Sequence, residues 1–212
     1  LTIQASGLQT GPPGEGVVKP LLDSYVDDIS RIPGVERAIG RLIESSIIKY
    51  NGITDFSFAA SMPDGQDRRE VERIANLEID QGRLLKDGDT NKVVLGINYA
   101  SSETFGKPVK LRDTVTVQDK EFEVVGILKK KGSFIIDNAI ILNEDVLRAL
   151  HEVNDTYDVL VAVVPNPEDM ARVKARVEEY LRKERDVEKG EEDFSVESPE
   201  QALANLDSTL FA

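Results

Sequence analysis

The stretch from residue 157 to residue 185 reads YDVLVAVVPNPEDMARVKARVEEYLRKER and contains signals for a strand followed by a helix. Its first part is apolar and rich in valine, which predicts a buried strand over 157–164. Asn166 can cap the helix, Pro167 suits its first position, and two acidic residues complement the positive end of its dipole. The core-facing stripe recurs at helical spacing and consists of Met170, Val173, Val177 and Leu181. Basic residues suit the negative end of the dipole, namely Arg182, Lys183 and Arg185.

An earlier stretch repeats this order of elements. Apolar residues at three- and four-residue spacing predict a helix over 20–32, which Pro33-Gly34 ends before a strand begins at Val35. The later stretch continues in the same way, because a polar segment leads to a strand at 194–196. Two such helix–strand units with antiparallel strands are the ingredients of a split βαβ, ferredoxin-like lobe. We therefore expect an α+β protein of two lobes, in which a mostly β lobe is inserted into the ferredoxin-like one.

A long β-hairpin is predicted over 35–62. Asn51-Gly52 is a two-residue turn signal of the kind that joins antiparallel strands. Beyond the turn Phe56, Phe58 and Met62 alternate along one face of the strand. We expect a helix to cover that face.

The rest of the chain predicts further short elements. They are a charged helix at 67–75, a strand at 93–95, a helical turn at 100–105, strands at 115–117, 122–128 and 139–142, a helix over 143–150 and a last helix from about residue 200. One lobe is then expected from 17–76 together with 152–205, and the inserted β-rich lobe from 77–151.

The composition excludes several classes of protein. Lys and Arg number 26 against 39 Asp and Glu, so the formal charge of −13 repels nucleic acid, and the run Lys129–Lys131 is too short to reverse this. The chain contains no cysteine, which excludes disulfide scaffolds, thiolate metal sites and thiol catalysis. The longest apolar run, Val159–Val164, is far shorter than the roughly 20 residues of a membrane helix. A start without Met or a basic segment indicates a piece of a longer protein.

Motifs for catalysis, cofactors and metals are weak or missing. His151 is the single histidine, and its place near the end of a predicted helix is typical of a surface residue. Asp87–Asn91 begins like a calcium loop, but Lys92 and Asn98 stand where Gly and Glu are needed. Asn154–Thr156 is a glycosylation sequon, usable only outside the cytoplasm. We assign no catalytic, cofactor-binding or metal-binding residue and expect no enzymatic activity.

The middle of the chain resembles the core domain of a group of transporters. The residues that carry the resemblance are Leu77–Leu85 with its Gly82-Arg83 pair, Asp87, Asp89, Lys92–Gly96, Ala100, Phe105-Gly106 and Phe122–Leu128. This pattern is similar to that of MacB-like extracytoplasmic core domains, found in ABC transporter permeases of the macrolide-exporter, lipoprotein-release and FtsX-like group. One feature departs from the pattern, because the family usually has a glycine where residues 107–114 contain none.

The resemblance implies a non-catalytic domain looped between two membrane helices, in the periplasm or outside the cell. It implies a porter-like first lobe, with residues 1–16 as a membrane-proximal linker and residues 206–212 as the approach to the next membrane helix. ATP would be hydrolysed on a separate ATPase subunit or domain, and this domain would transmit the motion to a substrate or partner outside the membrane. A second permease copy is the other implied partner, and no cofactor is implied.

Two other functions stay open. A free-standing extracytoplasmic binding or adhesion module could have the same fold. A hydrolase is less favoured, because only one histidine is available to activate a nucleophile.

Overall fold

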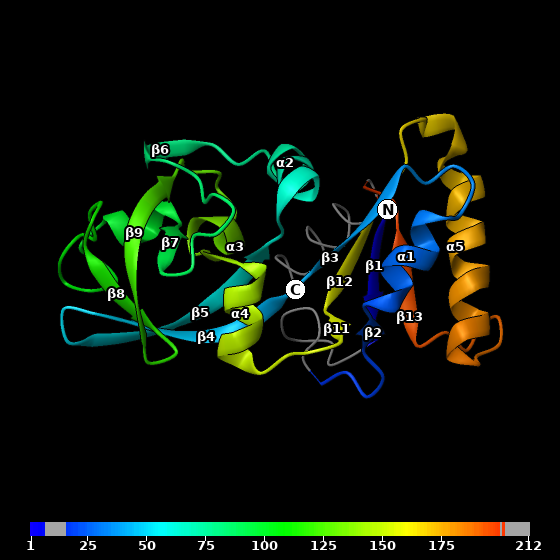
Figure 1. Ribbon diagram of the computed structural model, residues 1–212, viewed down its shortest axis with the longest axis horizontal. Coiled ribbons are helices and arrows are strands. Elements are labelled where there is room, and N and C mark those ends of the chain that lie inside the picture. The colour runs from blue at the N-terminus through cyan, green and yellow to red at the C-terminus, as the bar shows by residue number, and fades with distance from the viewer. Residues whose placement is uncertain (7–15, 200, 202–212) are drawn as a thin grey trace. The chain divides into compact units, whose positions relative to one another are not determined.

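The chain divides into two compact units in the computed structural model, which describes residues 1–6, 16–199 and 201. Unit 1 comprises Leu1–Arg41 and the described residues from Asp155 onward, and unit 2 comprises Leu42–Asn154. The second unit is therefore an insertion into the first, as the sequence predicts. Each unit is built around its own sheet (Figure 1).

Unit 1 contains a four-stranded antiparallel sheet in the order β13-β1-β12-β3. Numbered within the unit, this order is 4-1-3-2 with a helix after the first and third strands, which confirms the predicted ferredoxin-like lobe. Its elements are β1 (Thr2–Ala5), β2 (Leu21–Leu22), α1 (Ser24–Ser30), β3 (Arg37–Arg41), β11 (Thr156–Tyr157), β12 (Val159–Val163), the 3-10 helix η2 (Pro167–Asp169), α5 (Met170–Arg185) and β13 (Phe194–Glu197).

The core of unit 1 lies between the sheet and its two helices. The predicted stripe of α5 supplies the fully buried side chains of Val173, Val177 and Leu181. They pack in one cluster with buried residues of the sheet and of α1, including Ile3, Tyr25, Ile29, Leu160 and Val196. Both helices thus cover the same face of the sheet (Figure 1).

Two expectations for the N-terminal part of unit 1 are wrong. Residues 1–16 were expected to form a linker, but Thr2–Ala5 is a central strand because Ile3 is fully buried in the core. The helix expected over 20–32 begins only at Ser24, since Leu21–Leu22 pairs with β11 as a short strand. The last helix expected from about residue 200 and the membrane approach at 206–212 lie outside the described residues, apart from 201.

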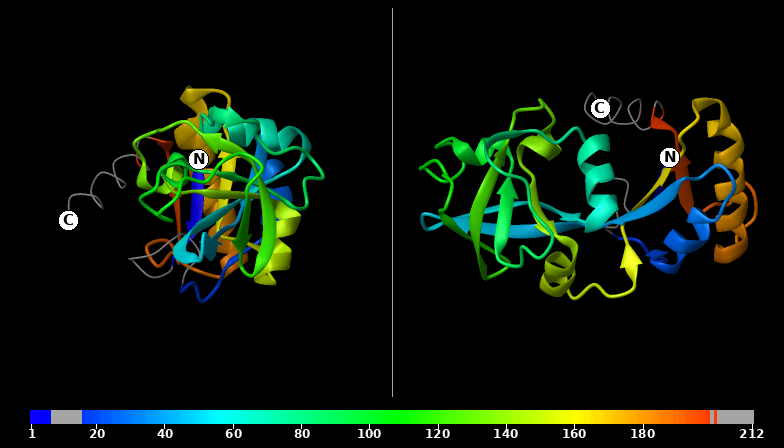
Figure 2. Two further views of the ribbon diagram at one scale, coloured as in Figure 1. Left: turned by 90° about the vertical axis from the view of Figure 1, so that its left-hand side faces the viewer. Right: turned by 45° about the horizontal axis from the view of Figure 1, so that its top comes forward.

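Unit 2 is a closed sheet. Its strand order is β6-β9-β7-β10-β5-β4-β8, and β8 also pairs with β9, so the strands return on themselves (Figures 1 and 2). Its elements are β4 (Ile43–Tyr50), β5 (Ile53–Met62), α2 (Gly65–Ile74), β6 (Ile79–Gly82), β7 (Lys92–Leu95), the 3-10 helix η1 (Ile97–Ala100), β8 (Thr114–Val117), β9 (Lys120–Leu128), α3 (Phe134–Asp137), β10 (Ile140–Asn143) and α4 (Glu144–His151).

The first boundary between the units lies at residues 41/42 and not at the expected 76/77. β4 pairs with β8 and β5 pairs with β10, so residues 43–62 of the predicted hairpin belong to the closed sheet of unit 2. Its expected beginning is wrong, because Arg37–Arg41 is β3 and pairs with β12 in unit 1. The sequence did not reveal this boundary, because the two strands of a hairpin pair with each other and their pattern does not show which sheet they join. The second boundary, at 154/155, lies close to the expected 151/152.

The hairpin turn is as predicted, but its buried face is not. Asn51 and Gly52 adopt φ angles of 50° and 75°, the left-handed pair that a tight two-residue turn requires. The face that contains Phe56 was expected to be covered, yet Phe56 is 76% exposed, and only Met62 at the end of that face is buried, at 2%. The opposite face is the buried one and carries Ile48 and Ala59. The inner face of β5 carries small and polar residues, so hydrophobicity did not identify it as the buried face.

Candidate functional site

The acidic loop that begins like a calcium site is held by arginines. Asp87 accepts a hydrogen bond of 2.8 Å from Arg68, and Asp89 accepts bonds of 2.7 and 3.2 Å from Arg83. A hydrogen bond from the Gly65 amide, and then the one from Arg68, lower the pKa of Asp87. Burial raises the pKa of Asp89, but the hydrogen bonds from Arg83 and the Lys86 amide outweigh it, so that pKa is lowered as well. Within the described residues no three His, Asp or Glu side chains converge as a metal would require.

The single histidine is not a surface residue, contrary to expectation. The His151 side chain is only 11% exposed, and its Nε2 lies 2.9 Å from the Ser46 hydroxyl. Its Nδ1 lies 3.9 Å from a carboxylate oxygen of Glu44. Burial lowers the pKa of His151, while Glu44 opposes this. The order serine, histidine, acid is that of a nucleophilic triad, but Ser46 is only 3% exposed and its hydroxyl already bonds to the Glu44 carbonyl and to His151.

A hollow of about 410 Å³ lies on the uncovered face of the β4–β5 hairpin. Its apolar lining is provided by Ile47, Phe56 and Phe58, with serines and Gln118 around them. The Gln118 side chain accepts a hydrogen bond of 2.9 Å from the Ile47 amide, which fixes one wall. None of the described residues that line this hollow is charged.

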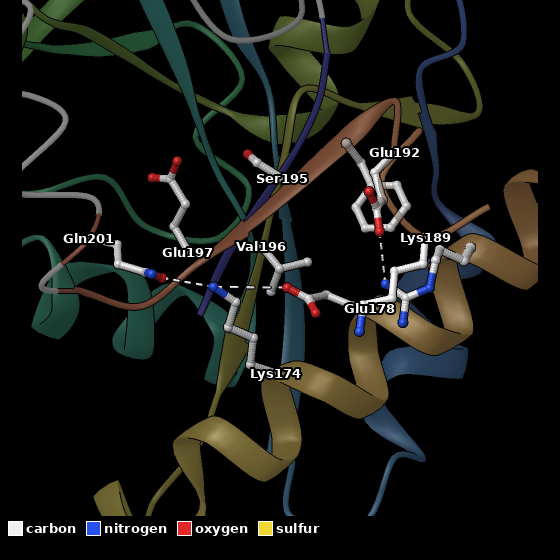
Figure 3. Close-up of a pocket in the computed structure, with 10 residues that line it drawn as sticks. Lys174, Glu178, Lys189, Glu192, Ser195, Val196, Glu197 and Gln201 are labelled. Atoms are coloured by element: carbon white, nitrogen blue, oxygen red, sulfur yellow. Dashed lines mark hydrogen bonds and ion pairs between the residues drawn. The ribbon is translucent and has the colours of Figure 1, made fainter. Parts of the chain in front are cut away.

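A larger groove, of about 490 Å³, lies in unit 1 between α5 and β13 (Figure 3). The helix lies alongside the strand, as the right-hand view of Figure 2 shows. The residues that line it are Lys174, Glu178, Arg182, Lys189, Glu192, Phe194, Ser195, Val196, Glu197 and Gln201. It is therefore a polar groove with an apolar floor, running along the edge of a sheet.

The helical wall of the groove is built by residues spaced four apart. Lys174, Glu178 and Arg182 share one side of α5 because this spacing is close to a full turn. Lys174 donates a hydrogen bond of 2.9 Å to the side chain of Gln201 and lies 3.8 Å from Glu178 (Figure 3). Arg182 donates at 2.9 Å to Glu192, which comes from the segment before β13. The wall is thus tied to both ends of the strand.

The strand wall is the outer edge of the sheet. β13 pairs with β1 on one side and with no other strand of the described part of the chain. Phe194 and Val196 are 6% and 4% exposed, so their side chains anchor the strand in the core, while Ser195 faces solvent. The alternation was visible in the sequence, but the edge position was not, because it depends on the strand order.

A buried arginine fixes the end of the groove. The Arg185 side chain is fully buried and donates hydrogen bonds of 2.6 and 2.8 Å to the two carboxylate oxygens of Asp193. Its remaining donors reach the carbonyl groups of Lys19 and Pro20. The arginine therefore lowers the pKa of Asp193 and holds the residue before β13 against the end of α5. The sequence suggested only a favourable charge at the helix end.

Comparison with known proteins identifies the family. The family model described as the MacB-like periplasmic core domain matches residues 1–180. The chain belongs to this family. An uncharacterized ABC transporter permease of Methanocaldococcus jannaschii is 33% identical over 183 residues, which cover 86% of this chain. The chain spans 44% of the length of that relative.

Solved structures of MacB-like domains have the same fold. The periplasmic region of MacB from Actinobacillus actinomycetemcomitans superposes with a TM-score of 0.68 at 15% identity, over 97% of this chain and 91% of that one. The extracellular domain of the noncanonic ABC-type transporter YknZ from Gram-positive bacteria gives 0.66 at 14% identity, over 93% and 98%. The resemblance seen in the sequence is therefore confirmed, together with the two-lobed α+β fold.

The residues that mark this MacB-like domain in the sequence have structural roles. Gly82 has a φ of 79°, and a Cβ there would lie 2.2 Å from the Val125 carbonyl oxygen. A Cβ on Gly126 would likewise lie 2.1 Å from the carbonyl oxygen of Arg83. Both glycines thus allow β6 and β9 to approach closely, and the Arg83–Asp89 pair braces the loop that follows. The pattern thus reflects the packing of the closed sheet.

Arg112 adopts a backbone conformation typical of glycine, in the segment 107–114 where the family usually has one. Its φ is 71°, a left-handed conformation that glycine adopts without strain. Asp113 stabilises the turn, because its side chain accepts hydrogen bonds from the Lys110 amide at 2.9 Å and from the Tyr50 hydroxyl at 2.6 Å. The bond from Tyr50 lowers the pKa of Asp113 and raises that of Tyr50 to about 12.

The described helices of this MacB-like domain include none with the length and apolar character needed to cross a bilayer. The longest, Met170–Arg185, has a polar and charged outer side.

Proposed function

We propose that this chain is the extracytoplasmic domain of an ABC transporter permease and transmits ATP-driven motion to the export or release of a substrate outside the membrane. The domain itself carries out no bond chemistry in this proposal. ATP is hydrolysed on a separate ATPase subunit or domain, and a second permease copy completes the transporter. Membership of the MacB-like family and the identity to a permease support this assignment.

The observation that carries the proposal is the short connection through which the chain passes from unit 1 into unit 2. A single residue, Leu42, separates β3 from β4. Its amide and carbonyl groups are both bonded to Ser61, at 2.9 Å each. On the other side of this junction the Arg41 carbonyl accepts from the Asp158 amide at 3.0 Å. Each unit thus holds its own end of this connection by hydrogen bonds, and the connection contains no long flexible linker, which would absorb a displacement.

Distance measurements in the full transporter test the proposal. This chain has no cysteine, so once any cysteine elsewhere in the transporter is replaced, spin labels can be placed at Ala175→Cys in unit 1 and Thr114→Cys in unit 2, both exposed positions. Pulsed electron paramagnetic resonance then reports the 175–114 distance and the 175–175 distance between two permease copies. The transporter is measured in nanodiscs with its ATPase, without nucleotide and trapped with ATP.

At least one of these distances should change when ATP is trapped. The pair Ala175→Cys and Glu36→Cys lies within unit 1 and serves as the control that should stay constant. If none of the distances responds to ATP, the coupling role is contradicted. The alternative of an extracytoplasmic binding or adhesion module with this fold would then be preferred.

A further inference from the structure

The outer edge of β13 presents backbone groups that have no described partner. The register places Ser6 opposite Asp193, and the Ser6 amide donates to the Asp193 carbonyl at 2.7 Å. In an antiparallel ladder every second residue bonds to the neighbouring strand, so Ser195 and Glu197 bond to β1. Phe194 and Val196 consequently direct their N–H and C=O groups away from the sheet, into the groove.

The pairing of β1 with β12 gives the same result independently. Leu1 and Ala162 exchange both backbone bonds, at 2.7 and 2.9 Å, so β1 uses its odd-numbered residues toward β12. Its even-numbered residues are left for β13, in agreement with the register above. Free donors and acceptors that alternate along a straight edge match another extended strand.

The charges of the groove suit a polypeptide and not a polyion. The described residues of its lining include three cations and three carboxylates, and Arg182 and Glu192 neutralise each other. Lys189 has no hydrogen-bond or ion-pair partner among the described residues. An acidic side chain near one end of the bound segment would complement it.

We propose that this groove binds an extended segment of a partner protein, which adds as a fifth strand beside β13 and carries an acidic residue next to Lys189. The bound backbone would pair with Phe194 and Val196, while its side chains on one face would contact the α5 wall. This inference concerns binding by the chain itself and does not depend on the coupling role proposed above.

A second copy of the chain fits this edge poorly. A two-fold pairing of two β13 edges would place the α5 wall against its own reversed copy. Because Lys174 pairs with Glu178 and Arg182 with Glu192 within each copy, this contact would gain no complementary charge. Unit 1 also carries 11 basic and 20 acidic residues, a net charge of −9 that opposes self-association.

Selection from a library of random 12-residue peptides displayed on phage tests the proposal on the intact chain. Peptides that bind should combine alternating apolar residues with an acidic residue. Amide hydrogen exchange followed by NMR should show the Phe194 and Val196 amides exchanging freely in the chain alone. Both should become protected when a selected peptide, made synthetically, is bound.

Two matched variants separate the groove from the rest of the helix. Glu178→Trp fills the groove from the α5 wall and should weaken the selected peptide at least tenfold. Glu179→Trp places the same bulk on the neighbouring exposed residue and should leave binding unchanged. Lys189→Glu should weaken peptides that carry the acidic residue, without a change in the unfolding midpoint that would indicate damage to the fold.

Several results would overturn the proposal. They are a library that yields no binder, binders that leave the two amides unprotected, and amides that are already protected in the chain alone. Sedimentation equilibrium provides the remaining check, because a dimer that protects these amides would assign the edge to a second copy instead of a partner.

Discussion

Replacing Arg185 with methionine should destabilise unit 1 selectively. The guanidinium group is fully buried and supplies four hydrogen bonds, two of them to Asp193 and two to backbone carbonyl groups. Methionine has a similar size and is apolar, so the change removes the charge and the donors without leaving a large cavity. What remains is a carboxylate without its partner beside two unsatisfied carbonyl groups.

The size of the effect follows from the burial of each partner. Breaking a buried ion pair from one side costs about 3–5 kcal/mol. The Asp193 side chain is 33% exposed and regains part of its hydration, which places the expected loss at the lower end, about 3 kcal/mol. Since 1.4 kcal/mol corresponds to a tenfold change, the slowest amides of unit 1 should exchange roughly a hundredfold faster.

Hydrogen exchange with mass spectrometry at pH 7 resolves the two units and is the assay of choice. Peptides from β1 and β12 should lose protection, while peptides from β9 in unit 2 should keep it. Arg176→Met is the control, because Arg176 lies on the same helix and makes one exposed bond to the Pro33 carbonyl. Asp193→Asn in the Arg185→Met background should recover part of the loss by removing the unpaired charge. An Arg185→Met chain whose unit 1 exchanges at the wild-type rate, or whose two units lose protection equally, would refute the reasoning.

Three further outcomes are expected. Arg112→Gly should raise the free energy of unfolding by about 0.5–1 kcal/mol in urea denaturation. The free energy gained by relieving the left-handed strain at Arg112 exceeds the cost of the more flexible unfolded chain. An unchanged or lower free energy of unfolding would mean that the turn holds Arg112 without strain. Burial lowers the pKa of His151, so the stability that the neutral histidine contributes is present above about pH 6.5 and is lost as the pH falls through the folded-state pKa. His151→Gln should flatten this decline when urea midpoints are measured against pH. A variant whose midpoints fall with pH as those of the wild type do would contradict this. The chain, with its charge of −13, should be monomeric at micromolar concentration and low salt in sedimentation equilibrium; a tight dimer lost in Phe56→Ser would show that the exposed hairpin face overcomes the repulsion.

Signals that act locally allowed most of the elements to be predicted. The proline and the acidic first turn placed the helix that follows Asn166, although the Asn166 side chain makes no capping hydrogen bond, and Asn51-Gly52 placed the hairpin turn. Thr2–Ala5 was missed because a four-residue strand at the start of the chain carries too little periodicity to be recognised. Its burial depends on partners more than 150 residues away, such as Leu160 and Val196.

The faces of strands were harder to predict than their existence. On β5 the larger aromatic residues alternate with small and polar ones, and hydrophobicity alone favours burying Phe56. The closed sheet leaves space inside for Ala59, while Ser57 donates a hydrogen bond of 2.7 Å to the Asn138 carbonyl. His151 was expected at the surface because its burial depends on a distant contact, with Ser46, which is 105 residues away in the sequence.

The groove lies where the family pattern carries least information. The residues that mark the family hold the closed sheet of unit 2 together, as the close approach of Gly82 and Gly126 to neighbouring backbone shows. The family match ends at residue 180, whereas Lys189 and β13 follow it. The requirement for a strand-shaped ligand comes from backbone groups and is set by the fold, so any chain with this edge could meet it. Selectivity must then come from the side chains around the edge. In this chain these are the α5 wall and Lys189, and they are the positions at which a change of partner would be encoded.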